Sequence, residues 1–370
     1  MAGPTALVVG GTGPTGPFVV NGLIARGYQV AIFHRGTHEV PEIPPEVEHV
    51  HGDPHFPETI DAALGDRTFD VTVAAYGRLR HVAAALAGRT GRFLAVGGVA
   101  VYRGLLEPEL LTPPGMPVPV GETDPVVTAP DEVAFSAAMV RTEDAVFEHH
   151  PEGTLFRYPY VYGPYQIIPR EWSVVRRLLD GRRQLLLPDA GLRLETHGWA
   201  GNLAHSVLLA LDQPEAAAGR RYNCGDIEQL DLRQVVLTIA EALDREVELI
   251  PVPWDVAGPA RLQSALGTRY HTLMDLHAIR AELGYTDALS SREAMARTAR
   301  WYVEHPLAPG GSMEEQLGDP FDYEAEDRLI AVALEARERL GEAALLSTAE
   351  LAHPYPHPKE AGQATDHRGR

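Results

Sequence analysis

The heptapeptide GGTGPTG at residues 10–16 constrains the fold of this 370-residue chain more than any other segment. It follows the apolar run ALVV and precedes a second apolar run, PFVVNGLIA. A strand, a glycine-rich turn and a helix in this order are typical of a dinucleotide-binding unit, in which the helix N-terminus faces a pyrophosphate. Gly10 would make the tight turn, Gly13 would let the backbone approach the anion, and Gly16 would pack the helix against the strand. The cradle is expected to comprise Gly10, Thr12, Gly13, Pro14, Thr15 and Gly16.

The next segment, YQVAIFHRG at 28–36, indicates which dinucleotide is bound. NAD-binding proteins usually carry an acidic residue at the end of this strand, about 20 residues past the glycines. Here the residues are His34 and Arg35. Arg35 can bind a 2′-phosphate through charge-assisted hydrogen bonds, which favours NADP(H); the alternative is an ordinary solvated loop arginine. Asp53, just after the third strand, can accept a hydrogen bond from the adenine amino group.

Histidines gather around the same third strand, at His49, His51 and His55. A metal site is the obvious hypothesis to test against this pattern. We expect none, because alternating strand residues need not converge and no other ligand cluster accompanies them.

Short β-rich runs and helical stretches alternate over the first 100 residues, which predicts a parallel sheet with crossover helices. The expected fold class is α/β, a Rossmann-type doubly wound parallel sheet with a smaller C-terminal α/β substrate lobe. We expect helix N-caps near Asn202 and at Asp231, and a capping box formed by Ser290 and Glu293.

These patterns also predict how the chain is divided. The dinucleotide-binding core is expected at 1–165, with a later strand and helix returning to it around 195–225. The substrate lobe would occupy mainly 166–310, a helical extension 311–351, and a polar, disordered tail 352–370.

Composition excludes several classes of function. The net charge of −19 disfavours binding to nucleic acid or anionic lipid. The single cysteine, Cys224, excludes an internal disulfide. The sequence shows neither a long apolar run nor a basic leader, so we expect a cytoplasmic protein without a membrane span. Lys359 is the only lysine among 32 basic residues, so chemistry that needs an ammonium group is nearly excluded.

Taken in order, several segments of the chain resemble the extended short-chain dehydrogenase/reductase superfamily, in the branch of NAD-dependent epimerases and dehydratases. The resemblance covers about residues 5–305 and includes GGTGPTG, LAVGGVAVYRG, FSAAMVRTEDAV, LFRYPYVYGP, THGWAGNLAHSVLLAL and YNCGDIEQLDLRQVVLTIAEAL. It implies a Rossmann domain with a C-terminal substrate lobe, and further cofactor contacts at Ala75, Gly97 and Pro159. It also implies a homodimer that pairs through the helix containing FSAAMVRTEDAV.

Relatives of this kind use a serine or threonine, a tyrosine and a lysine four residues later to move a proton at the substrate oxygen. The resemblance places Gly98 at the hydroxyl position, Phe135 at the tyrosine and Met139 at the lysine. Glu143 falls at an acid that often follows them. The usual proton-transfer groups are therefore predicted to be missing, although Phe135 and Met139 fit equally well as ordinary core residues of a helix.

Other titratable side chains lie on segments that the resemblance places near the nicotinamide. The candidate catalytic residues are Tyr102, Tyr160, Tyr162 and His197. An unassisted phenol has a pKa near about 10 and can donate a hydrogen bond, whereas an imidazole, at about 6.5, can exchange protons at neutral pH. Tyr160 also replaces an asparagine common in nucleotide-sugar enzymes, and the neighbouring aromatic residues favour an aromatic or polyketide-like small molecule.

The sequence therefore favours an NADP(H)-dependent oxidoreductase that reduces a C=O or a conjugated C=C with an unusual proton donor. Two alternatives stay open. One is a redox-neutral isomerase, epimerase or lyase on the same scaffold, and the other is a non-catalytic NADP-binding sensor or scaffold.

Overall fold

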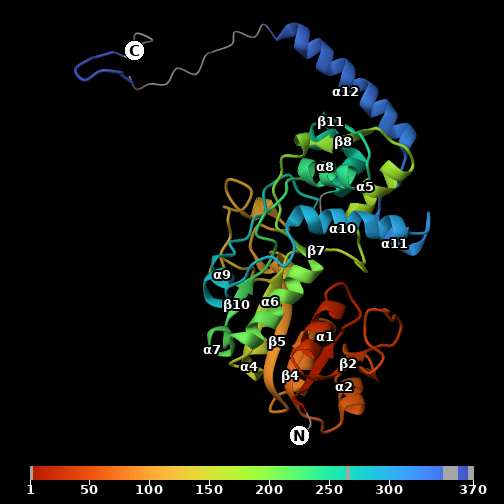
Figure 1. Ribbon diagram of the computed structural model, residues 1–370, viewed down its shortest axis with the longest axis vertical. Coiled ribbons are helices and arrows are strands. Elements are labelled where there is room, and N and C mark those ends of the chain that lie inside the picture. Colours follow the sequence, from red (N-terminus) through yellow and green to blue (C-terminus); the bar gives the residue numbers. More distant parts are fainter. Residues whose placement is uncertain (1–2, 264–266, 345–356, 366–370) are drawn as a thin grey trace. The chain divides into compact units, whose positions relative to one another are not determined.

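The computed structural model describes residues 3–263, 267–344 and 357–365 (Figure 1). The chain divides into two compact units, of which the first ends at Tyr323 and the second begins at Glu324. The first unit contains the central sheet and both cavities described below. Among the described residues, no helix combines the length and the apolar character that crossing a membrane requires.

A seven-stranded parallel sheet forms the base of the first unit, in the strand order β10-β6-β5-β4-β1-β2-β3. This order begins at β1, inside the sheet, and runs outward through β2 and β3 on one side and through β4, β5, β6 and β10 on the other, which confirms the predicted doubly wound Rossmann-type fold. The strands are β1 Thr5–Val9, β2 Gln29–His34, β3 Glu48–His51, β4 Phe69–Ala74, β5 Thr90–Gly98, β6 Thr154–Tyr158 and β10 Arg221–Asn223.

Alternate residues of β1 pack on opposite faces of the sheet, because successive side chains of a strand point to opposite sides. Ala6 and Val8 belong to a core shared with helices α1, α6 and α9. Leu7 and Val9 belong to a second core, shared with α2, α3 and α4. These helices are α1 Gly16–Ala25, α2 Pro57–Leu64, α3 Leu79–Ala85, α4 Ala134–His149, α6 Ala200–Asp212 and α9 His277–Leu283, with the short α7 at Pro214–Ala217.

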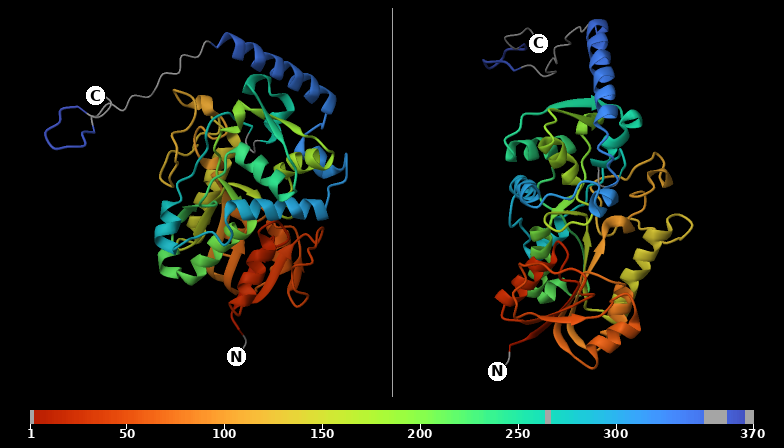
Figure 2. Two further views of the ribbon diagram at one scale, coloured as in Figure 1. Left: turned by 45° about the horizontal axis from the view of Figure 1, so that its top comes forward. Right: turned by 90° about the vertical axis from the view of Figure 1, so that its right-hand side faces the viewer.

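A smaller lobe lies at one end of the sheet, drawn in green and cyan in Figure 2. Its core joins helices α5, α8 and α10 to the parallel strands β8 and β11, and β7 pairs with β9 beneath it. The elements are α5 Arg170–Leu179, α8 Leu232–Ala242, α10 Ser291–Glu304, α11 Ser312–Leu317, β7 Tyr160–Tyr162, β8 Gln184–Pro188, β9 His197–Trp199 and β11 Glu248–Val252. Five 3-10 turns complete the unit, at Val99–Val101, Pro108–Leu110, Asp189–Gly191, Trp254–Val256 and Gly258–Gln263.

Residues after 310 fall into both units. Helix α11 belongs to the first unit, where Glu314 accepts hydrogen bonds from Trp172 Nε1 at 2.7 Å and from Arg176 Nη1 at 2.7 Å. Helix α12, Tyr323–Ala343, makes up most of the described part of the second. The predicted tail at 352–370 lies largely outside the described residues.

The starts of some helices can be predicted from the local sequence, and the starts of others cannot. Asp231 forms the N-cap of α8 in a complete capping box, which confirms that prediction. Ser290 is the N-cap of α10 and accepts a hydrogen bond from the Glu293 N–H, so one of the two bonds of the expected capping box is present. The expected cap near Asn202 is wrong. Helix α6 begins at Ala200, and the Asn202 side chain instead forms buried hydrogen bonds to Asp226 and to the backbone around Leu289.

Candidate functional site

A cavity of about 590 Å³ opens at the carboxyl ends of β1, β2 and β4. Strands of a doubly wound sheet leave a crevice at this edge where the strand order reverses, and ligands of such sheets bind there. Nine of the twelve expected cofactor residues line it, namely Gly10, Thr12, Gly13, Pro14, Thr15, Gly16, His34, Arg35 and Ala75.

The glycine turn has the geometry that a pyrophosphate needs. Gly10 has φ +106°, which favours glycine, and a Cβ on Gly16 would lie 2.0 Å from the Gly11 carbonyl oxygen. A Cβ on Gly13 would meet nothing within 4 Å, so its open side faces the cavity that this glycine lines. Thr15, at the N-cap of α1, makes no side-chain capping bond. The cradle therefore fits a dinucleotide phosphate beside a helix N-terminus.

At the end of β2, Arg35 lies over the Tyr76 ring, with its guanidinium carbon 5.6 Å from the ring centre, and both residues line the cavity. A cation at this end of the cavity suits an anionic group of a ligand.

Three expected cofactor residues are not on the cavity wall, namely Asp53, Gly97 and Pro159. The Asp53 carboxylate accepts hydrogen bonds from the backbone N–H of His55 at 3.0 Å and from its Nδ1 at 2.6 Å. These bonds lower the Asp53 pKa. Because the carboxylate is already paired, the geometry gives no support for its predicted contact with adenine.

A second cavity of about 240 Å³ lies in the lobe and brings together Tyr160 and His197, two of the candidate catalytic residues. The Tyr160 hydroxyl accepts a hydrogen bond from the Arg170 N–H at 2.8 Å, and it lies 3.0 Å from the Ile168 carbonyl and 3.3 Å from Glu171 Oε2. The Tyr160 and His197 rings meet edge to face, 5.6 Å apart.

Burial changes the acidity of these groups. It raises the pKa of Glu171 to about 7 and raises that of Tyr160 well above its usual range. It also lowers the pKa of His197. Glu171 is the group that sequence reasoning missed, and the signal was present. Glu171 shares a helix face with apolar residues three and four positions later, Val174 and Val175, so a buried carboxyl was readable from the spacing.

An unpaired acceptor also faces this second cavity. Glu195 is buried, lines the cavity and pairs with Arg193, yet its Oε1 has no hydrogen-bond partner among the described residues. Buried polar atoms are rarely left unsatisfied, so a ligand is the natural partner for this oxygen.

The other two tyrosine candidates, Tyr102 and Tyr162, lie on the wall of neither cavity. Tyr102 donates to Asn223 Oδ1 at 2.6 Å and accepts from Arg157 Nη1 at 2.8 Å, and burial raises its pKa to about 12. Tyr162 donates to Asp226 Oδ2 at 2.7 Å. Both hydroxyls are held by buried protein partners.

At the predicted positions of the usual proton-transfer groups, Met139 is partly buried and packed, whereas Phe135 is mostly exposed, so the reading of Phe135 as a core residue is wrong. The Met139 methyl lies 3.1 Å from where a Cβ on Gly98 would be, so the thioether fills the space of a hydroxyl there. Phe135 is 62% exposed. Glu143 is buried in an ion pair with Arg157 at 2.7 Å.

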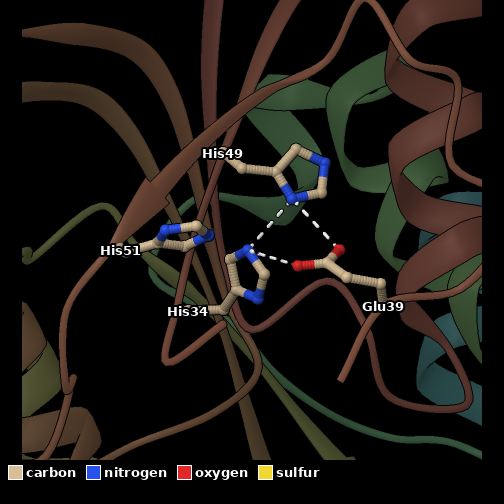
Figure 3. Close-up of side chains that lie close together, drawn as sticks. All are labelled: His34, Glu39, His49 and His51. Atoms are coloured by element: carbon tan, nitrogen blue, oxygen red, sulfur yellow. Dashed lines mark hydrogen bonds and ion pairs between the residues drawn. The ribbon is translucent and has the colours of Figure 1, made fainter. Parts of the chain in front are cut away.

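Three histidines converge at the edge of the sheet, contrary to expectation. His34, His49 and His51 gather with Glu39, whereas His55 lies apart on Asp53 (Figure 3). The expectation failed because His49 and His51 are two residues apart and point to the same face of β3.

We compared the chain with known proteins by sequence and by structure. No protein-family model matches the chain. It is 29% identical over 161 residues to a dTDP-glucose 4,6-dehydratase of Streptomyces griseus, covering 41% of this chain and 44% of that protein. The chain spans about half the length of the curated relatives it matches.

Solved structures are similar to a larger part of the chain than the curated relatives are. The enzyme WbmH of Bordetella bronchiseptica, in complex with NAD⁺, superimposes with a TM-score of 0.65 at 15% identity, covering 82% of this chain and 99% of that one. DesIV, a dTDP-glucose 4,6-dehydratase of Streptomyces venezuelae with NAD bound, gives 0.60 at 21% identity, covering 81% and 97%. The chain therefore shares the fold of these solved enzymes, which include epimerases and dehydratases.

Proposed function

We propose that this protein is an NADP(H)-dependent enzyme of the extended short-chain dehydrogenase/reductase type that reduces a C=O or a conjugated C=C in a small metabolite. The observation that carries the proposal is the glycine-floored cavity at the carboxyl edge of the sheet, with the N-terminus of α1 beside it. When bound there, a reduced nicotinamide would supply the hydride.

The choice of NADP over NAD rests on the end of β2. An acidic residue at this position would repel a 2′-phosphate, and β2 ends instead in His34 followed by Arg35. Arg35 lines the cavity and can form charge-assisted hydrogen bonds to a phosphate.

The second cavity supplies the substrate site and the proton. Apolar and aromatic side chains form much of its wall, including Leu192, Leu232 and Trp254, which suits a weakly polar or aromatic metabolite. Glu171, with a pKa of about 7, can donate or accept a proton at neutral pH. We assign it, with Tyr160 and His197 beside it, the role that a tyrosine and a lysine have in relatives.

Strand β7 links the two cavities. Tyr160 lines the second cavity and its neighbour Val161 lines the first. Under the proposal, the reacting group of the substrate lies beside β7, where it receives the hydride from the nicotinamide side and the proton from Glu171 on the lobe side, while the rest of the substrate stays in the lobe.

The cradle is tested with Gly13→Val, because a side chain there enters the open cavity without meeting other protein atoms. We expect NADPH to bind the native protein tightly enough to titrate by its fluorescence, and Gly13→Val to weaken binding at least about tenfold. Gly121→Val, at a partly exposed glycine outside the cavity, is the matched control. Unchanged NADPH binding by Gly13→Val would overturn the assignment of the cradle.

The preference for NADPH over NADH is measured in the same fluorescence titration. Arg35→Ala should weaken NADPH binding by roughly 1–3 kcal/mol, the size of a charge-assisted contact, and leave NADH nearly unchanged. Arg141→Ala, an exposed arginine on α4, serves as control. Equal losses for both dinucleotides would remove the argument for NADP.

A redox-neutral isomerase, epimerase or lyase is the second candidate, because a buried carboxyl with a pKa near 7 can both take and return a proton. A panel of carbonyl and enone compounds separates the two. Loss of NADPH absorbance that depends on Glu171 supports the reductase, whereas conversion without net NADPH oxidation supports the redox-neutral enzyme. NADPH binding without any conversion favours a sensor.

A further inference from the structure

The edge of the sheet carries a cluster of four side chains of types that bind metals, and three of them, Glu39, His49 and His51, have no part in the proposed function. His34 ends β2, His49 and His51 lie on the edge strand β3, and Glu39 lies in the connection between the two strands. One potential ligand atom from each side chain lies within 4.8 Å of all the others. Figure 3 shows the His34 and His49 rings and the Glu39 carboxylate turned toward one another, with His51 beside His34.

The strand register explains why these side chains meet. His34 pairs with His51 across the parallel β2–β3 ladder, and His49 is two residues before His51. Residues opposite one another, and residues two apart, share one face of a sheet. All three imidazoles therefore project from the same side, and the connection returns Glu39 over them.

The distances between the imidazole nitrogens and the carboxylate oxygens are those of side chains directed at one shared position. His34 Nε2 lies 3.1 Å from His49 Nδ1, and these nitrogens lie 3.7 Å and 3.2 Å from the two Glu39 carboxylate oxygens. A neutral imidazole offers one lone pair, and two such nitrogens directed at one carboxylate suit a shared cation.

We propose that His34, Glu39, His49 and His51 bind one divalent transition-metal ion of the zinc type. Three imidazole nitrogens and one carboxylate oxygen form a four-ligand set that zinc, cobalt and nickel accept, whereas magnesium and calcium prefer oxygen ligands alone. At a metal–nitrogen distance of about 2.0–2.1 Å, tetrahedral ligands lie roughly 3.4 Å apart. The most widely separated ligand atoms, up to 4.8 Å apart, therefore have to move about 1.4 Å closer.

The side chains that must move are those with room to do so. His34 is 3% exposed and fixed by the sheet, whereas Glu39 and His51 are exposed and His49 is half-buried. Rotation of these three toward His34 closes the set, and their exposure gives an ion access from solvent.

A bound ion would tie the edge strand β3 and the connection after β2 to the body of the sheet. His34 also lines the first cavity, so the ion would lie directly behind one part of its wall. The proposal does not depend on the proposed function, because its test measures metal binding without dinucleotide or substrate.

The test uses the full chain without an affinity tag, with ZnCl₂ in calorimetry and CoCl₂ in visible absorption. We expect one ion per chain, and Co²⁺ bands of the intensity typical of four-coordinate sites. His49→Ala and His51→Ala should each weaken Zn²⁺ binding at least about tenfold and reduce the Co²⁺ bands. Circular dichroism of each variant verifies that it is folded.

Two controls separate this cluster from other histidines. His55→Ala removes a neighbouring imidazole that pairs with Asp53, and should leave Zn²⁺ affinity unchanged. A variant with His353, His357 and His367 all changed to alanine removes the histidines of the C-terminal segment and should likewise bind one ion. The proposal is overturned if the native chain takes up no Zn²⁺ at micromolar concentration, if His49→Ala and His51→Ala bind as well as native, or if only the C-terminal variant loses the ion.

Discussion

Burial gives individual carboxyl groups of this protein unusual acidity. Glu171 lies on the apolar face of α5 and Asp226 lies beneath Tyr162, and loss of hydration raises their pKa values to about 7 and about 6. A charged carboxylate is disfavoured where water cannot reach it, so each group retains its proton to a higher pH than it would in the unfolded chain. The protonation of a single buried carboxyl therefore makes the free energy of unfolding depend on pH.

The free energy of unfolding should therefore fall as the pH rises through the titration of Glu171. Between its ordinary pKa of 4.5 and its folded pKa of about 7, the folded chain holds a proton that the unfolded chain has lost. Below the pKa of Glu171 in the unfolded chain, this group does not reduce the free energy of unfolding. Between that pKa and its pKa in the folded chain, the free energy of unfolding falls by about 3 kcal/mol.

Glu171→Gln keeps the shape and cannot ionise, so its stability should decline less between pH 5 and pH 8 than that of the native chain. Urea denaturation across this interval measures the difference, with Glu148→Gln, an exposed position on α4, as control. Parallel pH profiles for native and Glu171→Gln would contradict the raised pKa.

Helix starts differ in what holds them. The N-cap of α8 is a local device, in which Asp231 Oδ1 accepts from the Gln234 N–H at 2.7 Å and Gln234 Oε1 accepts from the Asp231 N–H at 2.9 Å. Helix α6 has no such side-chain cap at Trp199, and its first turn is held by hydrogen bonds from Asn202 to Asp226 and to the segment before α10. One helix start is specified within four residues and the other by distant chain.

Replacing these two side chains should therefore have unequal effects. Asp231→Ala should cost about 1 kcal/mol, the usual value of a cap. Asn202→Ala removes its hydrogen bonds to Asp226 and to three backbone groups, the Ala288 N–H and the Leu289 N–H and C=O, so a loss of roughly 3 kcal/mol or more is expected. Urea denaturation compares both with native, and a smaller loss for Asn202→Ala than for Asp231→Ala would show that its bonds do not fasten α6.

At the scale of the whole molecule, we propose that the chain forms a homodimer through α4. Ala134, Ala138 and Ala145 lie on one side of this helix, and their small side chains would let a second helix approach closely. The exposed Phe135 lies next to this stripe. The resemblance to dimeric enzymes predicts the same helix.

Light scattering should then give about twice the 40.3 kDa of one chain. Ala138→Arg, in the middle of the stripe, should shift the mass to that of a monomer without loss of helical circular dichroism. Ala62→Arg, the same change at an exposed position of α2, is the matched control. A monomeric native chain, or a dimer that persists in Ala138→Arg, would contradict this surface.

The sequence by itself determined the features that depend on near neighbours. The turn around Gly10 and Gly16, the capping box at Asp231 and the alternation of strands with helices were readable because backbone conformation and hydrogen-bond partners there lie within a few residues. The doubly wound sheet followed because these local units assemble in few ways.

Only the tertiary structure decided which distant side chains share a cavity. Tyr102 and Tyr160 look alike in the sequence, yet one hydroxyl is bound by Arg157 and Asn223 and the other lies beside Glu171 in the lobe. The convergence of His34 with His51 depends on the register of two strands, which the spacing within either strand does not contain. Acidity, pairing and access to a ligand depend on the burial that packing creates, and packing joins residues that are far apart in the chain.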